Sequence, residues 1–211
     1  DCSCRGGSGF AHLSCIVEYA KQKTEQWHGG EDPNPGDLDA WMDCPNCKQE
    51  YQNQLAVDTA TEFVSFLEGK YADDKLLQLE ARQQQILAFV NIRCRLQPTQ
   101  KEEFKQTANS VISMVAQIET EDPSLYKRAL VYGGNAYNIL GLLAEWEGTT
   151  EGAKTAVGYF EKFRDMCKAA DDDEGVAAAE SSLAVAKAKY EGNSETTEEE
   201  KLRRSLKMYD H

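Results

Sequence analysis

The stretch FKQTANSVISMV, residues 104–115, decides the fold class of the chain. Its apolar residues recur at helical spacing and are Phe104, Ala108, Val111, Ile112 and Val115. Polar side chains such as Glu103 and Gln106 fall off this stripe. An apolar stripe with the period of an α-helix has to be buried against another helix. The segment therefore predicts an amphipathic helix inside a packed helical array.

The chain from about Leu55 onward has the same helical spacing and no strand-like alternation. Thr99 with Glu102 and Thr196 with Glu199 have the spacing of capping boxes, Asp122 precedes Pro123 as a cap before a first-turn proline, and Pro98 closes the helix before it. These signals predict helices over 55–69, 73–95, 99–119, 123–147, 151–170, 173–191 and 197–209. We expect this region to be all-α.

One predicted helical hairpin carries a repeat-like pattern. Residues 136–143, AYNILGLL, are followed by Gly148 at a turn and by Ala153 and Phe160. Small residues at Gly141 and Ala153 would let the two helices approach closely. The pattern resembles a tetratricopeptide repeat of the extended kinesin-light-chain-like kind, with a related segment, ESSLA, at 180–184. The resemblance implies a solenoid that binds a protein or peptide; irregular helical hairpins are the alternative.

Six cysteine and histidine residues precede this helical region. They are Cys2, Cys4, His12, Cys15, Cys44 and Cys47. The spacings C-x-C, H-x2-C and C-x2-C are the half-sites that tetrahedral zinc selects, so we predict bound Zn²⁺. Two closed sites need eight ligands, and we therefore expect a further C-x2-C pair before Asp1; a single zinc site is the alternative. The number of cysteines, seven, is odd, five of them cluster in the first 47 residues, and no signal peptide is visible; these facts argue against a disulfide framework.

The residues around these ligands read CSCRG at 2–6, FAHLSCI at 10–16 and CPNCKQEY at 44–51. They resemble the RING-CH, or RING-variant, finger, whose ligand order is four cysteines, one histidine and three cysteines. Cys4 and His12 are separated by seven residues, a longer gap than in the PHD finger with the same ligand order. The resemblance implies that Cys2, Cys4, Cys44 and Cys47 hold one zinc ion, and that His12 and Cys15 belong to a second site.

The match to the RING-CH finger covers about the first quarter of the chain and departs from the family in two places. Tyr19 stands where the family usually has Trp, and the segment between Cys15 and Cys44 is longer than usual. We interpret this segment as an inserted acidic loop on the basis of Trp27, Gly29, Gly30, Asp32, Pro33, Pro35 and Gly36. The expected organisation is mainly α: a partial RING-CH-type zinc finger at 1–54, followed by a TPR-like helical domain at 55–211.

The function follows from the finger in this interpretation. Zinc in a closed four-coordinate site is structural and generates no nucleophile. The resemblance implies a surface on which a ubiquitin-conjugating enzyme docks, with Ile16, Pro45 and Lys48 at contact positions. The chain would be a ubiquitin ligase whose helical repeats bind the substrate and whose rate enhancement comes from orienting the thioester, without a catalytic side chain. The alternative is a non-catalytic interaction scaffold with a structural zinc finger.

Charge and composition limit the partners. The net charge is -13 over 211 residues, which makes nucleic acid an unfavourable partner because phosphate binding needs clustered Lys and Arg; a basic peptide is electrostatically favoured. The acidic runs at 171–174 and 198–200 fall at expected helix N-termini and are interpreted as caps, with a recognition patch as the alternative. No apolar run approaches the ~18 residues needed to cross a bilayer. We expect a soluble protein of the reduced cytoplasm or nucleus, where thiols can bind zinc.

Four further residues and one glycine pair have simpler interpretations. Cys94 and Cys167 lie in apolar helical stretches, which predicts packing in the core. His28 and His211 have no neighbours at ligand spacing and are expected to be solvated. The pair at 133–134, two glycines inside a predicted helix, indicates a kink or a close contact between helices.

Overall fold

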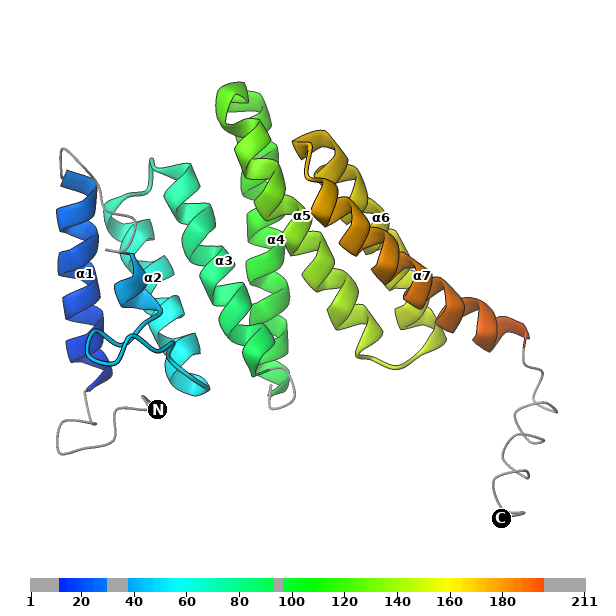
Figure 1. The fold of residues 1–211 in the computed structure, drawn as a ribbon, viewed down its shortest axis with the longest axis horizontal. Helices are drawn as coiled ribbons and strands as arrows, with labels where there is room; N and C mark the ends of the chain where they lie inside the picture. Colours follow the sequence, from blue (N-terminus) through cyan, green and yellow to red (C-terminus); the bar gives the residue numbers. More distant parts are fainter. Residues whose placement is uncertain (1–11, 30–37, 93–96, 196–211) are drawn as a thin grey trace, which may run out of the picture. The chain divides into compact units, whose positions relative to one another are not determined.

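The computed structural model describes residues 12–29, 38–92 and 97–195. Over these ranges the chain is helical (Figure 1). The elements are α1 (Leu13–Gly29), the 3-10 helix η2 (Asp39–Trp41), α2 (Gln54–Lys70), α3 (Lys75–Asn91), α4 (Pro98–Glu121), α5 (Pro123–Glu145), α6 (Thr150–Ala170) and α7 (Asp173–Glu195). The mainly α class is confirmed in this part of the chain. Of the helices described, none is long and apolar enough to cross a bilayer.

The six predicted helices that fall on described residues are present, and their ends move by at most four residues. The seventh, at 197–209, and the Thr196 capping box lie outside the described residues. Helix α3 ends at Asn91, before Pro98, and Pro98 is the first residue of α4, where a missing N–H is harmless. The capping box predicted at Thr99 and Glu102 is wrong: α4 starts earlier, and the Gln97 N–H donates to Gln100 Oε1 at 3.0 Å.

Helix α1 is absent from the predicted helices. Trp27 and Gly29, which we assigned to an acidic loop, belong to its last turns, so that assignment is wrong for them. The buried residues of α1 are Ile16, Val17, Ala20 and Thr24. This stripe is short and includes a threonine, so the periodic apolar signal is weak in the sequence. Gly30, Asp32, Pro33, Pro35 and Gly36 lie outside the described residues.

The chain divides into two compact units, at residues 1–125 and 126–211. The predicted boundary near residue 54 does not coincide with this division. Instead, α1 and η2 both pack against α2, so the cysteine-bearing segments and the first helices share one core. These elements share a core because the aromatic side chain of Trp41 packs between them. Trp41 is not part of the ligand motif of the finger.

Trp41 lies between α1 and α2 and is 1 % exposed. Its ring stacks on Phe63 of α2 at a centroid distance of 4.7 Å. Its indole N–H donates to Thr24 Oγ1 of α1 at 2.7 Å, and that hydroxyl donates to the Ala20 carbonyl at 3.0 Å. Burial of an indole stabilises a fold when the ring has apolar contacts and its N–H has a hydrogen-bond acceptor. Trp41 has both.

The remaining core of the first unit joins α2, α3 and α4 in sequence. The stripe predicted on 104–115 is buried: Phe104, Ala108, Val111 and Val115 are each at most 1 % exposed, while Ile112 is half-buried. Phe104 stacks on Phe89 of α3 at 5.2 Å. The apolar stripe of α4 is therefore buried, as its spacing predicts.

A buried polar cluster also ties these three helices together. Arg82 of α3, 8 % exposed, forms an ion pair with Glu68 of α2 and donates to Gln78 Oε1 at 2.7 Å and to Ser110 Oγ of α4 at 3.2 Å. Burial lowers the pKa of the Arg82 guanidinium, and the nearby Glu68 carboxylate opposes that effect. The guanidinium remains charged and satisfied, as a buried cation has to be.

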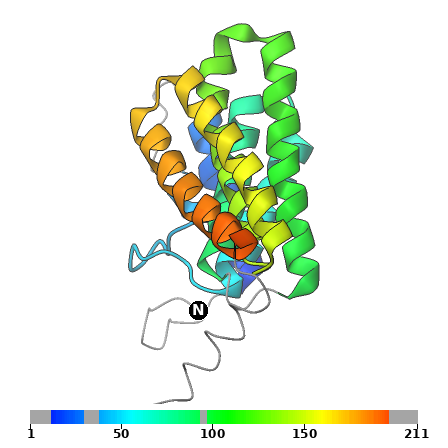
Figure 2. The same cartoon turned by 90° about the vertical axis from the view of Figure 1, so that its right-hand side faces the viewer.

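The second unit contains the predicted repeat-like hairpin and α7, which runs alongside α6 in both views (Figures 1 and 2). A Cβ built on Gly141 of α5 would lie 2.7 Å from Cδ1 of Phe160 on α6. One on Gly134 would lie 3.3 Å from the Phe163 ring. Both glycines therefore mark close contacts between the helices, and Gly148 forms the connecting turn with a φ of 69°.

The acidic run at 171–174 caps helices, as predicted. Asp172 Oδ1 accepts the Gly175 N–H at 2.9 Å at the start of α7. Asp171 ends α6 in the left-handed conformation and pairs with Lys127, which lowers the pKa of its carboxyl. Asp122 in turn accepts the Ser124 N–H at 3.2 Å at the start of α5. The run at 198–200 lies outside the described residues.

The contact between Gly141 and Phe160 predicts opposite effects for two glycine substitutions. Gly141→Ala places a methyl against a fully buried ring and should lower the free energy of unfolding by about 1–3 kcal/mol. Gly158→Ala, in α6 with open space around the new methyl, should raise it by about 0.5–1 kcal/mol. Urea unfolding followed by circular dichroism measures both, and equal effects would contradict the close contact.

A second prediction concerns the hydrogen bond of the Trp41 indole. Thr24→Val keeps the side-chain shape and removes the acceptor, leaving a buried N–H unpaired at a cost of about 1–3 kcal/mol. Thr120→Val is the matched control, because that exposed hydroxyl bonds only to the Gln117 carbonyl one turn earlier. Equal midpoints for the two variants in urea would show that the indole bond does not stabilise the first unit.

Candidate functional site

His12 directly precedes α1, and Cys15 lies in the first turn of that helix. The His12 carbonyl accepts the N–H of Cys15 at 2.9 Å and of Ile16 at 3.2 Å, which places His12 at the position just before the helix. Side chains at the cap and three residues later project from the same side of a helix start, as in a capping box. Both side chains are exposed. The H-x2-C spacing therefore becomes a pair of donors on one accessible surface.

Cys44 and Cys47 lie on a tight turn that follows η2. The turn is closed by backbone hydrogen bonds from Cys44 N–H to Gln49 O at 2.9 Å, from Lys48 N–H to Cys44 O at 2.9 Å and from Tyr51 N–H to Met42 O at 2.7 Å. Lys48 takes a φ of 57°, the left-handed conformation that reverses the chain directly after the second cysteine. The C-x2-C spacing is thus folded into a single turn.

Acidic side chains surround the base of this turn. Burial, with the Asp39 and Glu50 carboxylates, raises the pKa of the Asp43 carboxyl. Asp43 and Glu50 face one another across an isolated antiparallel bridge. Negative charge at this position favours a cation near the turn.

The donor set suits zinc, because thiolates and imidazole are its preferred ligands. Among the described residues, however, no three Cys, His, Asp or Glu side chains gather into one cluster. The structure brings together two pairs, His12 with Cys15 and Cys44 with Cys47. Cys2 and Cys4 lie outside the described residues. Zinc binding therefore stays a prediction that the described half-sites fit.

The three predicted contact residues for a conjugating enzyme differ in exposure. Pro45 and Lys48 are exposed on the cysteine turn. Ile16 is only 9 % exposed and packs in an apolar cluster with Cys44 and Tyr51. That packing gives Ile16 a role in supporting the turn, and leaves Pro45 and Lys48 as the accessible members of the set.

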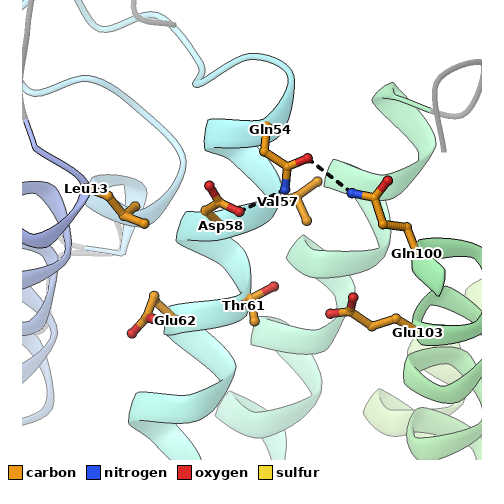
Figure 3. Close-up of a pocket in the computed structure, with 8 residues that line it drawn as sticks. All are labelled: Leu13, Gln54, Val57, Asp58, Thr61, Glu62, Gln100 and Glu103. Carbon is orange, nitrogen blue, oxygen red and sulfur yellow. Dashed lines mark hydrogen bonds between the residues drawn. The ribbon is translucent and has the colours of Figure 1, made fainter. Parts of the chain in front are cut away.

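An open acidic pocket of about 250 Å³ lies between α2 and α4, beside the start of α1 (Figure 3). It is lined by Leu13, Gln54, Val57, Asp58, Thr61, Glu62, Gln100 and Glu103. Gln54 links the two helices, because it donates to Asp58 Oδ1 at 2.8 Å and accepts from Gln100 Nε2 at 3.1 Å. Leu13 directly follows His12, so the pocket adjoins the first ligand pair.

Sequence reasoning missed this acidic pocket. Asp58 and Glu62 are one turn apart on α2, while Glu103 comes from α4, and only the packing of the helices places the three carboxylates around one hollow. The lining contains no Lys or Arg. Its charge excludes anions and favours cationic groups.

The other cysteines and histidines fit their predicted roles where they are described. Cys167 is 2 % exposed in the core of the second unit, and burial raises the pKa of its thiol to about 11, helped by Asp172. His28 is exposed; its ring stacks on Tyr71 at 4.2 Å and its Nε2 lies 3.6 Å from Asp74 Oδ2. Cys94 and His211 lie outside the described residues.

Comparisons with known proteins found no family model, no curated protein and no solved structure that matches the chain. The function therefore has to be inferred from the two half-sites, the acidic pocket and the helical hairpins.

Thiol alkylation at pH 8 should separate ligand cysteines from core cysteines. Cys167, with a pKa of about 11 and a buried sulfur, should label only after denaturant is added. Cys15 and Cys47, whose side chains are accessible, should label in chelator and be protected by zinc, because a coordinated thiolate is not free to react. Peptide mass spectrometry of labelled protein measures this. Zinc-independent labelling of both would argue against the metal half-sites.

Proposed function

We propose that this chain is a zinc-binding RING-CH-type protein that acts as a ubiquitin ligase. The cysteine-rich part would recruit a ubiquitin-conjugating enzyme, and the helical part would bind the substrate protein or peptide. The observation that carries the proposal is the Cys44–Cys47 turn, in which two thiols share one turn and Pro45 and Lys48 are exposed beside them. The family resemblance of residues 2–16 and 44–51 supports the same conclusion.

Zinc would be held by Cys44 and Cys47 with Cys2 and Cys4, and by His12 and Cys15 with a further pair. When bound, the metal supplies rigidity and no reactive group. The chain's own contribution is position: the turn presents the Pro45 ring as an apolar contact and the Lys48 ammonium as a donor to a carbonyl or carboxylate of the partner. Acceleration would come from holding the conjugating enzyme's thioester in a reactive orientation, which needs no catalytic side chain.

The helical part would choose the substrate. The hairpins of the second unit resemble a tetratricopeptide array, a geometry suited to binding peptides and helices. The acidic pocket of the first unit and the net charge of -13 both favour a substrate segment that carries Lys or Arg. A basic substrate segment is consistent with ubiquitin transfer, because the acceptor of ubiquitin is ordinarily a lysine amine.

A non-catalytic scaffold is the second candidate, and two observations favour it. Ile16, one of the three expected contact residues, is packed against Cys44 and Tyr51. Tyr19, at the position where the RING-CH family usually has Trp, is 38 % exposed on α1. In this function the metal would only stabilise an interaction array.

Ubiquitin chain formation by the zinc-loaded protein with a panel of conjugating enzymes tests the proposal. Cys44→Ser should abolish activity and Pro45→Ala should reduce it at least tenfold. Lys48→Gly is the sharpest variant: it removes the ammonium and suits the left-handed backbone, so the turn should be kept while activity falls. The control is Lys154→Ala, which removes an exposed lysine of α6 and should leave activity unchanged. Alanine is used at this position because a glycine would itself weaken the helix.

Two results would overturn the ligase in favour of the scaffold. One is the lack of activity with every conjugating enzyme while metal analysis shows bound zinc and circular dichroism shows an intact fold. The other is activity that survives Cys44→Ser unchanged.

A further inference from the structure

We infer that the open pocket between α2 and α4 binds one arginine side chain of a partner peptide. The apolar stem of the arginine would lie against Leu13 and Val57, and its guanidinium would lie among the carboxylates of the pocket. This deepens the proposed function, because it names the side chain by which the substrate is anchored. It rests on the proposed function only for the identity of the partner as a substrate.

The lining of the pocket combines an apolar surface with acidic groups. Its residues at 54, 57, 58, 61 and 62 have the spacing of one face of α2. In Figure 3, Leu13 extends from the start of α1 toward Asp58, and Glu103 extends from α4 toward Thr61. Val57 is 4 % exposed and Leu13 is half-buried. A long basic side chain suits this lining, because its methylene stem covers apolar atoms while its charged end contacts the acids.

The acids of this pocket lack the cation that other acids between helices have. In the first unit an ion pair joins α1 to α2, another joins α2 to α3, and a third joins α3 to α4; they are Glu25–Lys70, Glu68–Arg82 and Glu121–Lys75. In the part of the chain that the structure describes, no Lys or Arg pairs with Asp58, Glu62 or Glu103. Asp58 accepts a neutral amide N–H of Gln54 at 2.8 Å. The pocket therefore favours a cation that the described residues do not supply.

The spread of the carboxylates favours a guanidinium over a more compact cation. Within the described ranges, no three Cys, His, Asp or Glu side chains are close enough to hold one metal ion. The carboxylates of the pocket instead come from two helices, α2 and α4. An ammonium is a compact point charge, whereas a guanidinium presents five N–H donors in a planar fork and can donate to separate acceptors at once. The arrangement therefore fits arginine better than lysine.

Buried hydrogen bonds behind the pocket hold two of its acceptors in place. Gln85 of α3 is 5 % exposed, and its Nε2 donates to Thr61 Oγ1 at 3.0 Å and to Glu103 Oε1 at 3.5 Å. The side-chain oxygen of Gln85 accepts the Thr107 hydroxyl at 3.1 Å. Side chains that are ordered before binding lose less entropy when a partner arrives, so this wall of the pocket is preorganised.

Amide NMR of the full chain, titrated with short peptides, tests the inference. The probes are a five-residue peptide of Gly and Ser with Arg at its centre, and the same peptide with Lys or with citrulline, the neutral isostere of arginine. The Arg peptide should shift the signals of residues 54–62 and 100–103 and leave those of 156–186 unchanged. We expect the Lys peptide to bind about threefold to tenfold more weakly, and the citrulline peptide to cause no shift.

Charge-removing variants separate a local site from the overall negative charge. Asp58→Asn and Glu103→Gln keep the side-chain shapes and should each weaken binding of the Arg peptide about threefold to tenfold, because each removes a charged acceptor. Glu102→Gln is the matched control. It makes the same charge change on the exposed residue before Glu103, outside the lining, and should leave binding unchanged. Urea unfolding checks that all three variants are folded.

Three results would overturn the inference: equal shifts with the Arg and citrulline peptides, equal affinity for the Arg and Lys peptides, or equal loss of binding in Glu102→Gln and Glu103→Gln. The measurements need neither zinc nor a conjugating enzyme. If no peptide shifts the pocket signals, the inference is overturned and the proposed function stands. If ubiquitin transfer fails in every pairing while the Arg peptide binds, the ligase function is overturned and the inference stands.

Discussion

The stacking and hydrogen bonding of Trp41 are the contacts on which the first unit depends. One side chain of a 3-10 helix reaches α1 through its N–H and α2 through its ring face. Burial of so large a side chain stabilises the fold only because Thr24 satisfies the indole donor. The contacts of Trp41 position α1 and, with it, the His12–Cys15 pair. The cysteine turn is likewise positioned by it, since Trp41 directly precedes the residues that form the turn's base.

The helices of the chain could be predicted because their signals are local. The apolar stripe of α4, the Asp122–Pro123 start of α5 and the turn at Gly148 each depend on residues a few positions apart. Helix α1 could not be predicted in the same way. Its stripe gains meaning only from Trp41, which lies 17 residues beyond Thr24. Ligand spacing likewise carries no information about what the cysteine-bearing segments pack against, so the contacts of α1 and η2 with α2 were not predicted.

In the candidate site, too, local features could be predicted from the sequence, whereas contacts between helices could not. Ligand pairs such as Cys44 and Cys47 are near in sequence, so their spacing predicts a shared turn, and the fold provides it. The burial of Ile16 and the acidic pocket come from contacts between helices. Glu103 lines the pocket together with Asp58 and Glu62 of another helix. The sequence alone showed only the overall excess of negative charge. The sequence therefore predicted the local chemistry of the site but not the surfaces that two helices form together.

The buried guanidinium of Arg82 has a consequence for how the helices can move. Its acceptors come from Glu68 on α2, Gln78 on its own helix and Ser110 on α4. A sliding of α2 or α4 by one turn would take Glu68 or Ser110 away from the guanidinium, and a buried cation that loses a partner is costly. The cluster therefore favours the observed register of the three helices over its neighbours.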